Sequence, residues 1–131
     1  MSQYGRGTRS RRESARMRPF GDLEAVVMEH IWTADRPLTV RDVLERMDRE
    51  PPLAYTTVLT VMDNLHRKGF LSREREGRAF RYRPTKDRAE HTAELMHELL
   101  SDSGNASVTL LRFLDHMSPT EVARLKRALG D

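Results

Sequence analysis

The spacing of the hydrophobic residues changes at Gly69, and this change constrains the fold more than any other feature. Before Gly69, apolar residues recur at i, i+3, i+4 and i+7, which predicts a helix over about 54–68. Its buried face consists of Val58, Val61, Met62 and Leu65. After Gly69, aromatic residues alternate with arginines, which is the period of a β-strand. The sequence therefore predicts a hairpin over about 70–84 with its turn at Glu76–Gly77, packed on helices because isolated hairpins are marginally stable.

Two shorter helices precede this pair of elements. Gly21 is an N-cap candidate with Glu24 three residues later, and Thr39 with Asp42 repeats the same spacing. Pro51–Pro52 must end the second helix, because proline has no backbone N–H to donate. Three helices followed by a hairpin predict a winged helix-turn-helix.

The rest of the chain also reads as helical. Asp87 is a cap candidate before a long apolar stripe, and Ser118 with Glu121 has the capping-box spacing. The fold class is therefore mostly α with a small β-hairpin, namely a winged helix-turn-helix domain followed by a helical domain. We expect a disordered basic arm at 1–18, a winged-helix DNA-binding domain at 19–86 and a helical dimerisation domain at 87–131.

Positive charge is concentrated in two segments, although the formal net charge of the 131 residues is only +3. Residues 1–18 hold six arginines against one glutamate, and residues 67–88 hold nine basic against three acidic side chains. Such segregation favours a polyanionic partner, whereas a merely solvated surface would scatter the signs. The arginines of residues 1–18 could insert into the DNA minor groove, or they could form a tail that only increases solubility.

The exposed face of the third predicted helix carries residues suited to double-stranded DNA. Threonine and asparagine side chains can bond to base edges, and arginines attract phosphates irrespective of sequence. Tyr55 and Thr56 begin the helix, where backbone N–H groups also attract phosphate, although Tyr55 could equally pack on the second helix. Arg73 and Arg75 of the hairpin could contact phosphates, or they could pair with Glu74 and Glu76 across the hairpin. The predicted DNA contacts are Tyr55, Thr56, Thr57, Thr60, Asn64, Arg67, Arg78 and Arg81.

These motifs resemble the BlaI/MecI family of penicillinase repressors. Leu53–Leu65 followed by Lys68-Gly69 is similar to the family's recognition helix, Gly77–Pro84 to its wing, and Leu23–Trp32 to its first helix. The resemblance covers about residues 20–130. It implies a homodimer that binds dyad-symmetric operators through the winged helix and blocks transcription, often of β-lactamase or related resistance genes.

The chain departs from the family pattern at three points. Asn64 stands where the family often has arginine, which weakens any transfer of the family's operator sequence to this chain. In well-known members a membrane sensor-protease system cleaves an Asn–Phe bond in the C-terminal domain. The counterpart here is Arg112–Phe113, which weakens the case for proteolytic control. Copper-responsive relatives use a C-terminal cysteine cluster, and this chain has no cysteine, so copper sensing by that route is excluded.

The apolar stripes after residue 88 belong to a segment too short to enclose a core of its own. We expect them to be buried against a second copy, although they could pack back on the winged helix of the same chain. The predicted dimerisation residues are Met96, Leu99, Leu100, Leu111, Leu114 and Leu125.

Other classes of function have little support. The sequence has no cysteine, no apolar stretch long enough for a bilayer and no secretion signal, so we expect a cytoplasmic protein without direct membrane binding. His91, Glu94 and His97 are spaced too far around a helix for a metal site, and no catalytic constellation or phosphate loop is present. We therefore expect no metal, no cofactor and no enzyme activity. A nonspecific architectural DNA-binding protein and a protein-interaction adaptor remain the rival readings.

Overall fold

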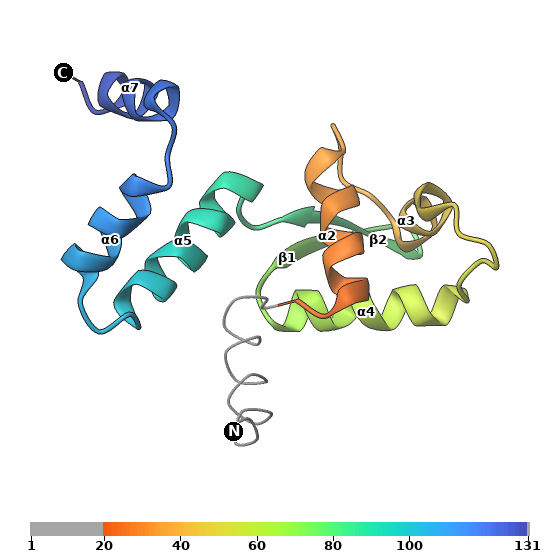
Figure 1. Cartoon of the computed structure of the whole chain (residues 1–131). Helices are drawn as coiled ribbons and strands as arrows, with labels where there is room; N and C mark the ends of the chain where they lie inside the picture. Colours follow the sequence, from red (N-terminus) through yellow and green to blue (C-terminus); the bar gives the residue numbers. More distant parts are fainter. Residues whose placement is uncertain (1–19, 131) are drawn as a thin grey trace. The chain divides into compact units, whose positions relative to one another are not determined.

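The computed structural model describes residues 20–130, so the predicted arm at 1–18 lies outside the described residues. These residues form six helices and one two-stranded antiparallel sheet, which confirms the predicted fold class (Figure 1). In chain order the elements are α2 (Asp22–Thr33), α3 (Val40–Met47), α4 (Tyr55–Arg67), β1 (Leu71–Glu76), β2 (Ala79–Pro84), α5 (Arg88–Ser101), α6 (Ala106–Asp115) and α7 (Pro119–Ala128).

The helices begin where the capping residues predicted them. At α2 the Gly21 N–H donates to Glu24 Oε1 at 3.0 Å. At α3 the Asp42 N–H donates to the Thr39 hydroxyl and the Thr39 N–H donates to the Asp42 carboxylate, each at 3.0 Å. These bonds satisfy N–H groups that have no acceptor inside the helix. The helix α3 ends at Met47, before the double proline that was expected to end it, because Asp48 adopts a left-handed φ of 46°.

The hydrophobic core lies in the winged-helix part of the chain. Three residues of α4 that the apolar stripe predicted, Val58, Met62 and Leu65, are fully buried, and Tyr82 of the hairpin is buried with them. The rest of the core comes from α2, α3 and their neighbours, namely Val27, Met28, Ile31, Leu38, Val40, Val43 and Leu71. The sheet and the three helices therefore share one core.

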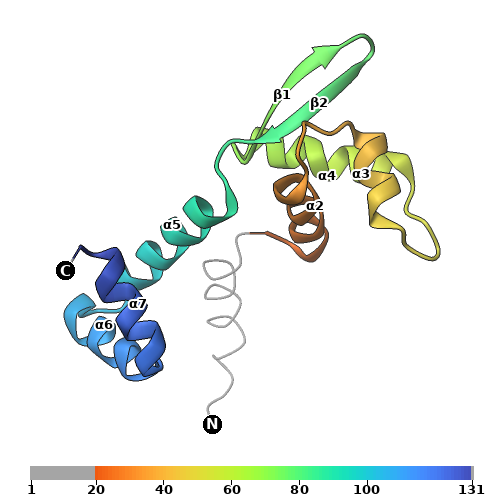
Figure 2. The same ribbon diagram turned by 90° about the horizontal axis from the view of Figure 1, so that it is seen from above.

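The hairpin is fixed to the helices by backbone as well as side-chain contacts. Leu38, in the segment between α2 and α3, exchanges two hydrogen bonds with Tyr82, of 3.0 and 2.8 Å. The turn lies at Gly77–Arg78, one residue later than predicted, because Glu76 still pairs with Ala79 in the ladder. Gly77 has φ of +64°, which glycine adopts without strain. Figure 2 shows the turn end projecting beyond α3 and α4.

The chain divides into two compact units, with the division between Thr92 and Ala93. The first turn of α5 belongs to the first unit, where the His91 ring stacks on Phe20 with centroids 4.9 Å apart. Trp32 and Phe70 complete this aromatic cluster, and Trp32 Nε1 donates to the Lys86 carbonyl at 3.0 Å. The residues that lead into α5 are thus anchored on the winged helix.

Candidate nucleic-acid interface

The helix α4 buries one side and exposes a polar face on the other. Thr56, Thr57 and Thr60 are exposed on this face, and no ion pair or side-chain hydrogen bond engages them within residues 20–130. Their hydroxyl groups can donate and accept, and their methyl groups can contact thymine. The first two turns of the face therefore offer base-reading chemistry without a fixed charge.

The N-terminus of α4 is open to an anion. No side chain of the described chain caps this end, and the first turn of α4 contains no acidic residue. The positive end of the helix dipole lies there, so backbone N–H groups can bind a phosphate. Tyr55 is 42% exposed, and the Arg41 guanidinium of α3 lies over its ring at 5.4 Å from the centroid. Tyr55 therefore packs against Arg41 of α3 while the residue stays accessible, and its phosphate contact remains a prediction.

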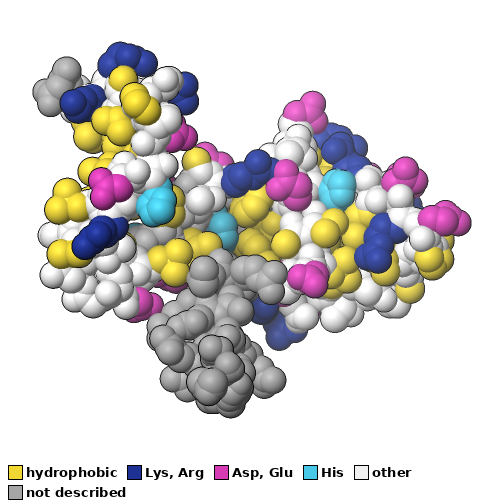
Figure 3. All heavy atoms as spheres, in the orientation of Figure 1, with side chains coloured by type: hydrophobic (Ala, Val, Ile, Leu, Met, Phe, Trp, Pro, Cys, Tyr) yellow, Lys and Arg dark blue, Asp and Glu magenta, His cyan; other side chains and the backbone are white. Residues whose placement is uncertain are grey.

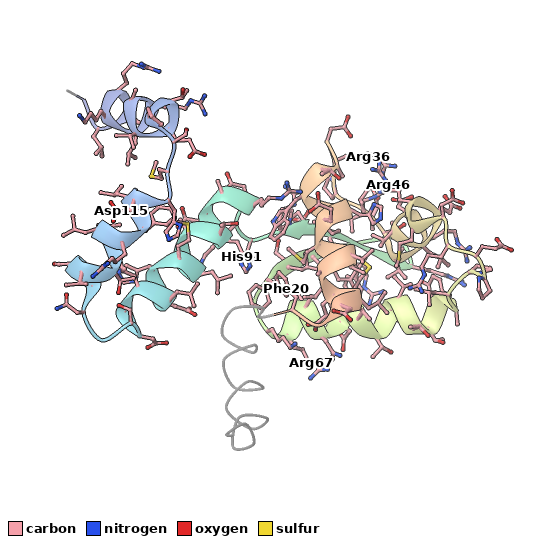
Figure 4. All side chains as sticks on the ribbon, in the orientation of Figure 1. Phe20, Arg36, Arg46, Arg67, His91 and Asp115 are labelled. Carbon is pink, nitrogen blue, oxygen red and sulfur yellow. The ribbon has the colours of Figure 1, made fainter. Side chains whose placement is uncertain are left out.

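The C-terminal half of the same face is a network of charged and polar groups. Arg67 Nε donates to Asp63 Oδ2 at 3.3 Å, and a second guanidinium nitrogen of Arg67 donates to Asn64 Oδ1. Arg67 remains 66% exposed at its side chain and points outward from α4 in Figure 4. Asn64, by contrast, is half-buried, and Arg67 already occupies its carbonyl oxygen.

Arg73 of β1 joins the wing to this network. Its Nη1 donates to Asp63 Oδ1 at 3.2 Å and to the Tyr82 hydroxyl at 3.4 Å, and its guanidinium lies 4.1 Å from the Phe80 ring centroid. The pKa of Arg73 is raised, chiefly because it donates to Tyr82 and then because of Asp63. The pKa of Asp63 is lowered, with Arg73 the largest cause. Asp63 is therefore ionised at neutral pH and Arg73 is occupied within the fold.

The two predicted wing contacts differ in their surroundings. Arg78 lies at the exposed turn and makes no ion pair with any residue of the described range. Arg81 is 39% exposed at its side chain and forms ion pairs with Glu76 and, at 3.7 Å, with Asp42. Glu76 is the main cause of the raised pKa of Arg81. Arg81 is thus brought toward α3, whereas Arg78 is free at the tip.

The second unit has an apolar surface that α5 and α6 form together. None of the residues of α5, α6 or α7 is fully buried. Among the predicted dimerisation residues, Met96, Leu99, Leu111 and Leu125 are 39–63% exposed, while Leu100 and Leu114 are half-buried. A hollow of about 410 Å³ between the two helices is lined by Ala93, Met96, His97, Leu99, Leu100, Thr109, Leu110 and Phe113. Figure 3 shows several groups of hydrophobic side chains exposed on this unit.

Two sets of residues in these surfaces were not predicted from the sequence. Asp63 and Arg73 lie ten positions apart on different elements, and only the i, i+4 spacing of Asp63 with Arg67 hinted at the network. Leu110 and Phe113, at 46% and 49% exposure, line the apolar hollow with the predicted leucines. Their spacing of three along α6 was the available signal.

Three helices, a basic hairpin and an exposed polar face on the third helix define a winged helix-turn-helix DNA-binding protein. Residues 20–131 match the penicillinase repressor family. The chain is 39% identical over 120 residues to the transcriptional regulator BlaI of Mycobacterium tuberculosis, covering 89% of this chain and 87% of that protein. The chain belongs to the penicillinase repressor family, as the motifs predicted, and is a DNA-binding transcriptional repressor, not an enzyme.

The chain is also similar to a second curated relative and to a solved structure. The penicillinase repressor of Bacillus licheniformis is 28% identical over 116 residues, which is 86% of this chain and 90% of that protein. The solution structure of the DNA-binding domain of the repressor BlaI is similar with a TM-score of 0.48 and 28% identity, covering 54% of this chain and 85% of that structure. None of the helices in residues 20–130 has the length and apolar character needed to cross a bilayer.

Proposed function

We propose that the protein acts in the cytoplasm as a homodimer that binds a dyad-symmetric operator and blocks transcription of β-lactam resistance or related genes. Each copy places α4 in the major groove of one half-site and the β1–β2 hairpin along the adjacent phosphates. The observation that supports this most is the exposed, uncharged threonine face of Thr56, Thr57 and Thr60 on α4. Within residues 20–130 these three side chains lie outside the core and make no ion pair, so they are available to base edges.

Phosphate contacts come from both ends of this surface in the proposal. The uncapped N-terminus of α4, with Tyr55 and Thr56, binds one phosphate, and Arg78 at the wing tip binds another. Arg81 can bind a phosphate as well only if it gives up its ion pair with Glu76. That exchange costs little, because an ion pair between exposed side chains contributes little to stability in water.

The dimer contact in the proposal is the apolar surface of α5 and α6, extended by Leu125 of α7. Exposed apolar side chains of this number are seldom left to water in a monomer, and a second copy would cover them. A membrane sensor-protease is a candidate regulator. Phe113 of the Arg112–Phe113 bond is exposed, but the bond lies inside α6, so cleavage there requires this helix to unwind.

Thr60→Ala tests base reading directly, with Thr57→Ala as a parallel variant. We expect each to lose about 1–3 kcal/mol of binding free energy on a duplex selected by the wild-type chain, and little on random duplex. The reason is that both hydroxyl groups contact bases in the proposal, and only the selected duplex offers matching bases. Competition between labelled selected duplex and unlabelled random duplex measures the difference.

The control for this test is Thr120→Ala, which removes the same group from an exposed position of α7. It should leave both affinities unchanged. An equal loss on selected and random duplex for Thr60→Ala would mean that this hydroxyl contributes no sequence preference.

Arg78→Ala tests the wing. We expect weaker binding to every duplex. We also expect the slope of the logarithm of the binding constant against the logarithm of salt concentration to become shallower by about one for each copy bound. This follows because each phosphate contact releases condensed counterions. Titrations at several salt concentrations measure the slope, and Arg127→Ala on α7 removes the same charge as a control. A slope identical to that of the wild type would remove Arg78 from the contact surface.

A further inference from the structure

Asp63 places a negative charge on the face of α4 that enters DNA in the proposed function. It lies three positions after Thr60 and four before Arg67, so all three share one side of the helix. Its side chain is 42% exposed. A carboxylate directed at a polyanion lowers affinity for any DNA sequence. Asp63 also contacts two arginines, and these contacts indicate a role for its carboxylate.

Each oxygen of the Asp63 carboxylate holds a different arginine. Oδ2 accepts from Arg67 Nε at 3.3 Å, and Oδ1 accepts from Arg73 Nη1 at 3.2 Å. Arg67 is also tied to the Asn64 carbonyl oxygen. Two attachments on its own helix fix the Arg67 guanidinium, although most of this side chain faces solvent. An arginine that is ordered before binding loses less side-chain freedom when it meets a base edge.

The other arginine gives the carboxylate a fixed position. Arg73 is only 24% exposed at its side chain, donates to the Tyr82 hydroxyl at 3.4 Å and lies over the Phe80 ring. Both aromatic residues belong to β2, and Tyr82 is fully buried in the core. Asp63 is therefore held from the wing side by a residue anchored in the fold, and it holds Arg67 on the outer side.

We infer that Asp63 is a positioning residue for specificity: it presents Arg67 to a guanine edge in the major groove and lowers the affinity for DNA in general. The paired N–H groups of an arginine match guanine O6 and N7, which is the commonest specific contact in protein–DNA complexes. This inference rests on the proposed function, because it requires α4 to read bases. It assigns Asp63 no base contact of its own.

Asp63→Ala in the full chain tests the inference on two probes, a duplex selected from a random library by the wild-type chain and a random duplex. We expect the affinity for random duplex to rise, since one negative charge is removed. We expect the ratio of selected to random affinity to fall at least about fivefold, since Arg67 is no longer held for its base. Asp63→Asn keeps one acceptor oxygen and should retain part of this ratio.

A double-mutant cycle with Arg67→Ala shows whether Asp63 acts through Arg67. In the Arg67→Ala background, Asp63→Ala should no longer change the ratio. If it still changes the ratio there by the same factor, Asp63 reads a base itself, for example as an acceptor from cytosine N4, and the inference is wrong. Asp115→Ala on α6 removes the same charge from an exposed position and should leave the ratio unchanged.

Two results distinguish a failure of the proposed function from a failure of the role of Asp63. A wild-type chain that prefers no sequence would overturn the proposed function and this inference together. A wild-type chain that prefers its selected duplex, with an Asp63→Ala variant of equal preference, would overturn only the role of Asp63. Thermal unfolding of each variant checks that the winged helix remains folded.

Discussion

Leu99→Asp is expected to convert the protein into a monomer and to lower its affinity for a selected palindromic duplex by about 100-fold or more. Leu99 is 40% exposed and lines the hollow between α5 and α6. A buried, unpaired carboxylate at a contact between two copies is strongly unfavourable. Once the copies separate, each half-site must be bound independently, and the gain from tethering is lost. Sedimentation measures the mass, and duplex titration measures the affinity.

The matched control is Ser107→Asp, which adds the same charge at an exposed polar position in the first turn of α6. Acid near a helix N-terminus is tolerated, so the control should stay dimeric and bind as the wild type does. Binding of the Leu99→Asp monomer to a single half-site should also be unchanged, since α4 and the wing are intact. A Leu99→Asp protein that remains a dimer would place the contact on another surface.

Tyr82→Ala is expected to lower the free energy of unfolding by about 3–5 kcal/mol, which is the usual cost of truncating a large buried aromatic residue. Tyr82 is fully buried, its backbone pairs with Leu38, and its hydroxyl accepts from Arg73. The substitution leaves a cavity where β2 meets the helices and releases the arginine that holds Asp63. Urea unfolding followed by circular dichroism measures the loss.

Tyr82→Phe separates these two effects. It keeps the buried ring and removes only the hydroxyl, so its cost should be about 0.5–1.5 kcal/mol, the usual net value of one hydrogen bond. The ratio of its affinities for selected and random duplex should also fall, although the protein stays folded. The reason is that Arg73, which holds Asp63, loses one of its two hydrogen-bond partners. A Tyr82→Ala protein as stable as the wild type would mean that the wing does not depend on this core position.

Local chemistry made much of the fold predictable. Capping pairs such as Thr39 with Asp42 act within one turn, so their sequence spacing is enough to locate a helix start. The stripe that contains Val58, Met62 and Leu65 is a property of one helix and was correctly assigned to the core. The alternation after Gly69 likewise identified the hairpin, and its turn was misplaced by only one residue.

Contacts between distant segments were not predictable in the same way. The pairing of Leu38 with Tyr82 joins the segment between α2 and α3 to β2, far along the sequence, and no local pattern marks it. Arg81 was predicted from its place on a basic hairpin. Its ion pair with Glu76 lies within that hairpin, but its ion pair with Asp42 of α3 depends on where the hairpin packs. The link from Asp63 to Arg73 has the same origin. A run of positive charge in the sequence therefore indicates a polyanionic partner. Which arginines are already engaged in ion pairs within the fold depends on the tertiary structure.

The central claim is that two copies of the chain each insert α4 into one half of a symmetric site. Selection of duplexes from a random library by the full-length wild-type protein, followed by measurement of the mass of the complex, tests it most directly. The account predicts an enriched inverted repeat whose half-sites are centred a whole number of helical turns apart, about 10 base pairs each, and two chains on each duplex. No enriched sequence, or a single asymmetric site bound by one chain, would contradict it.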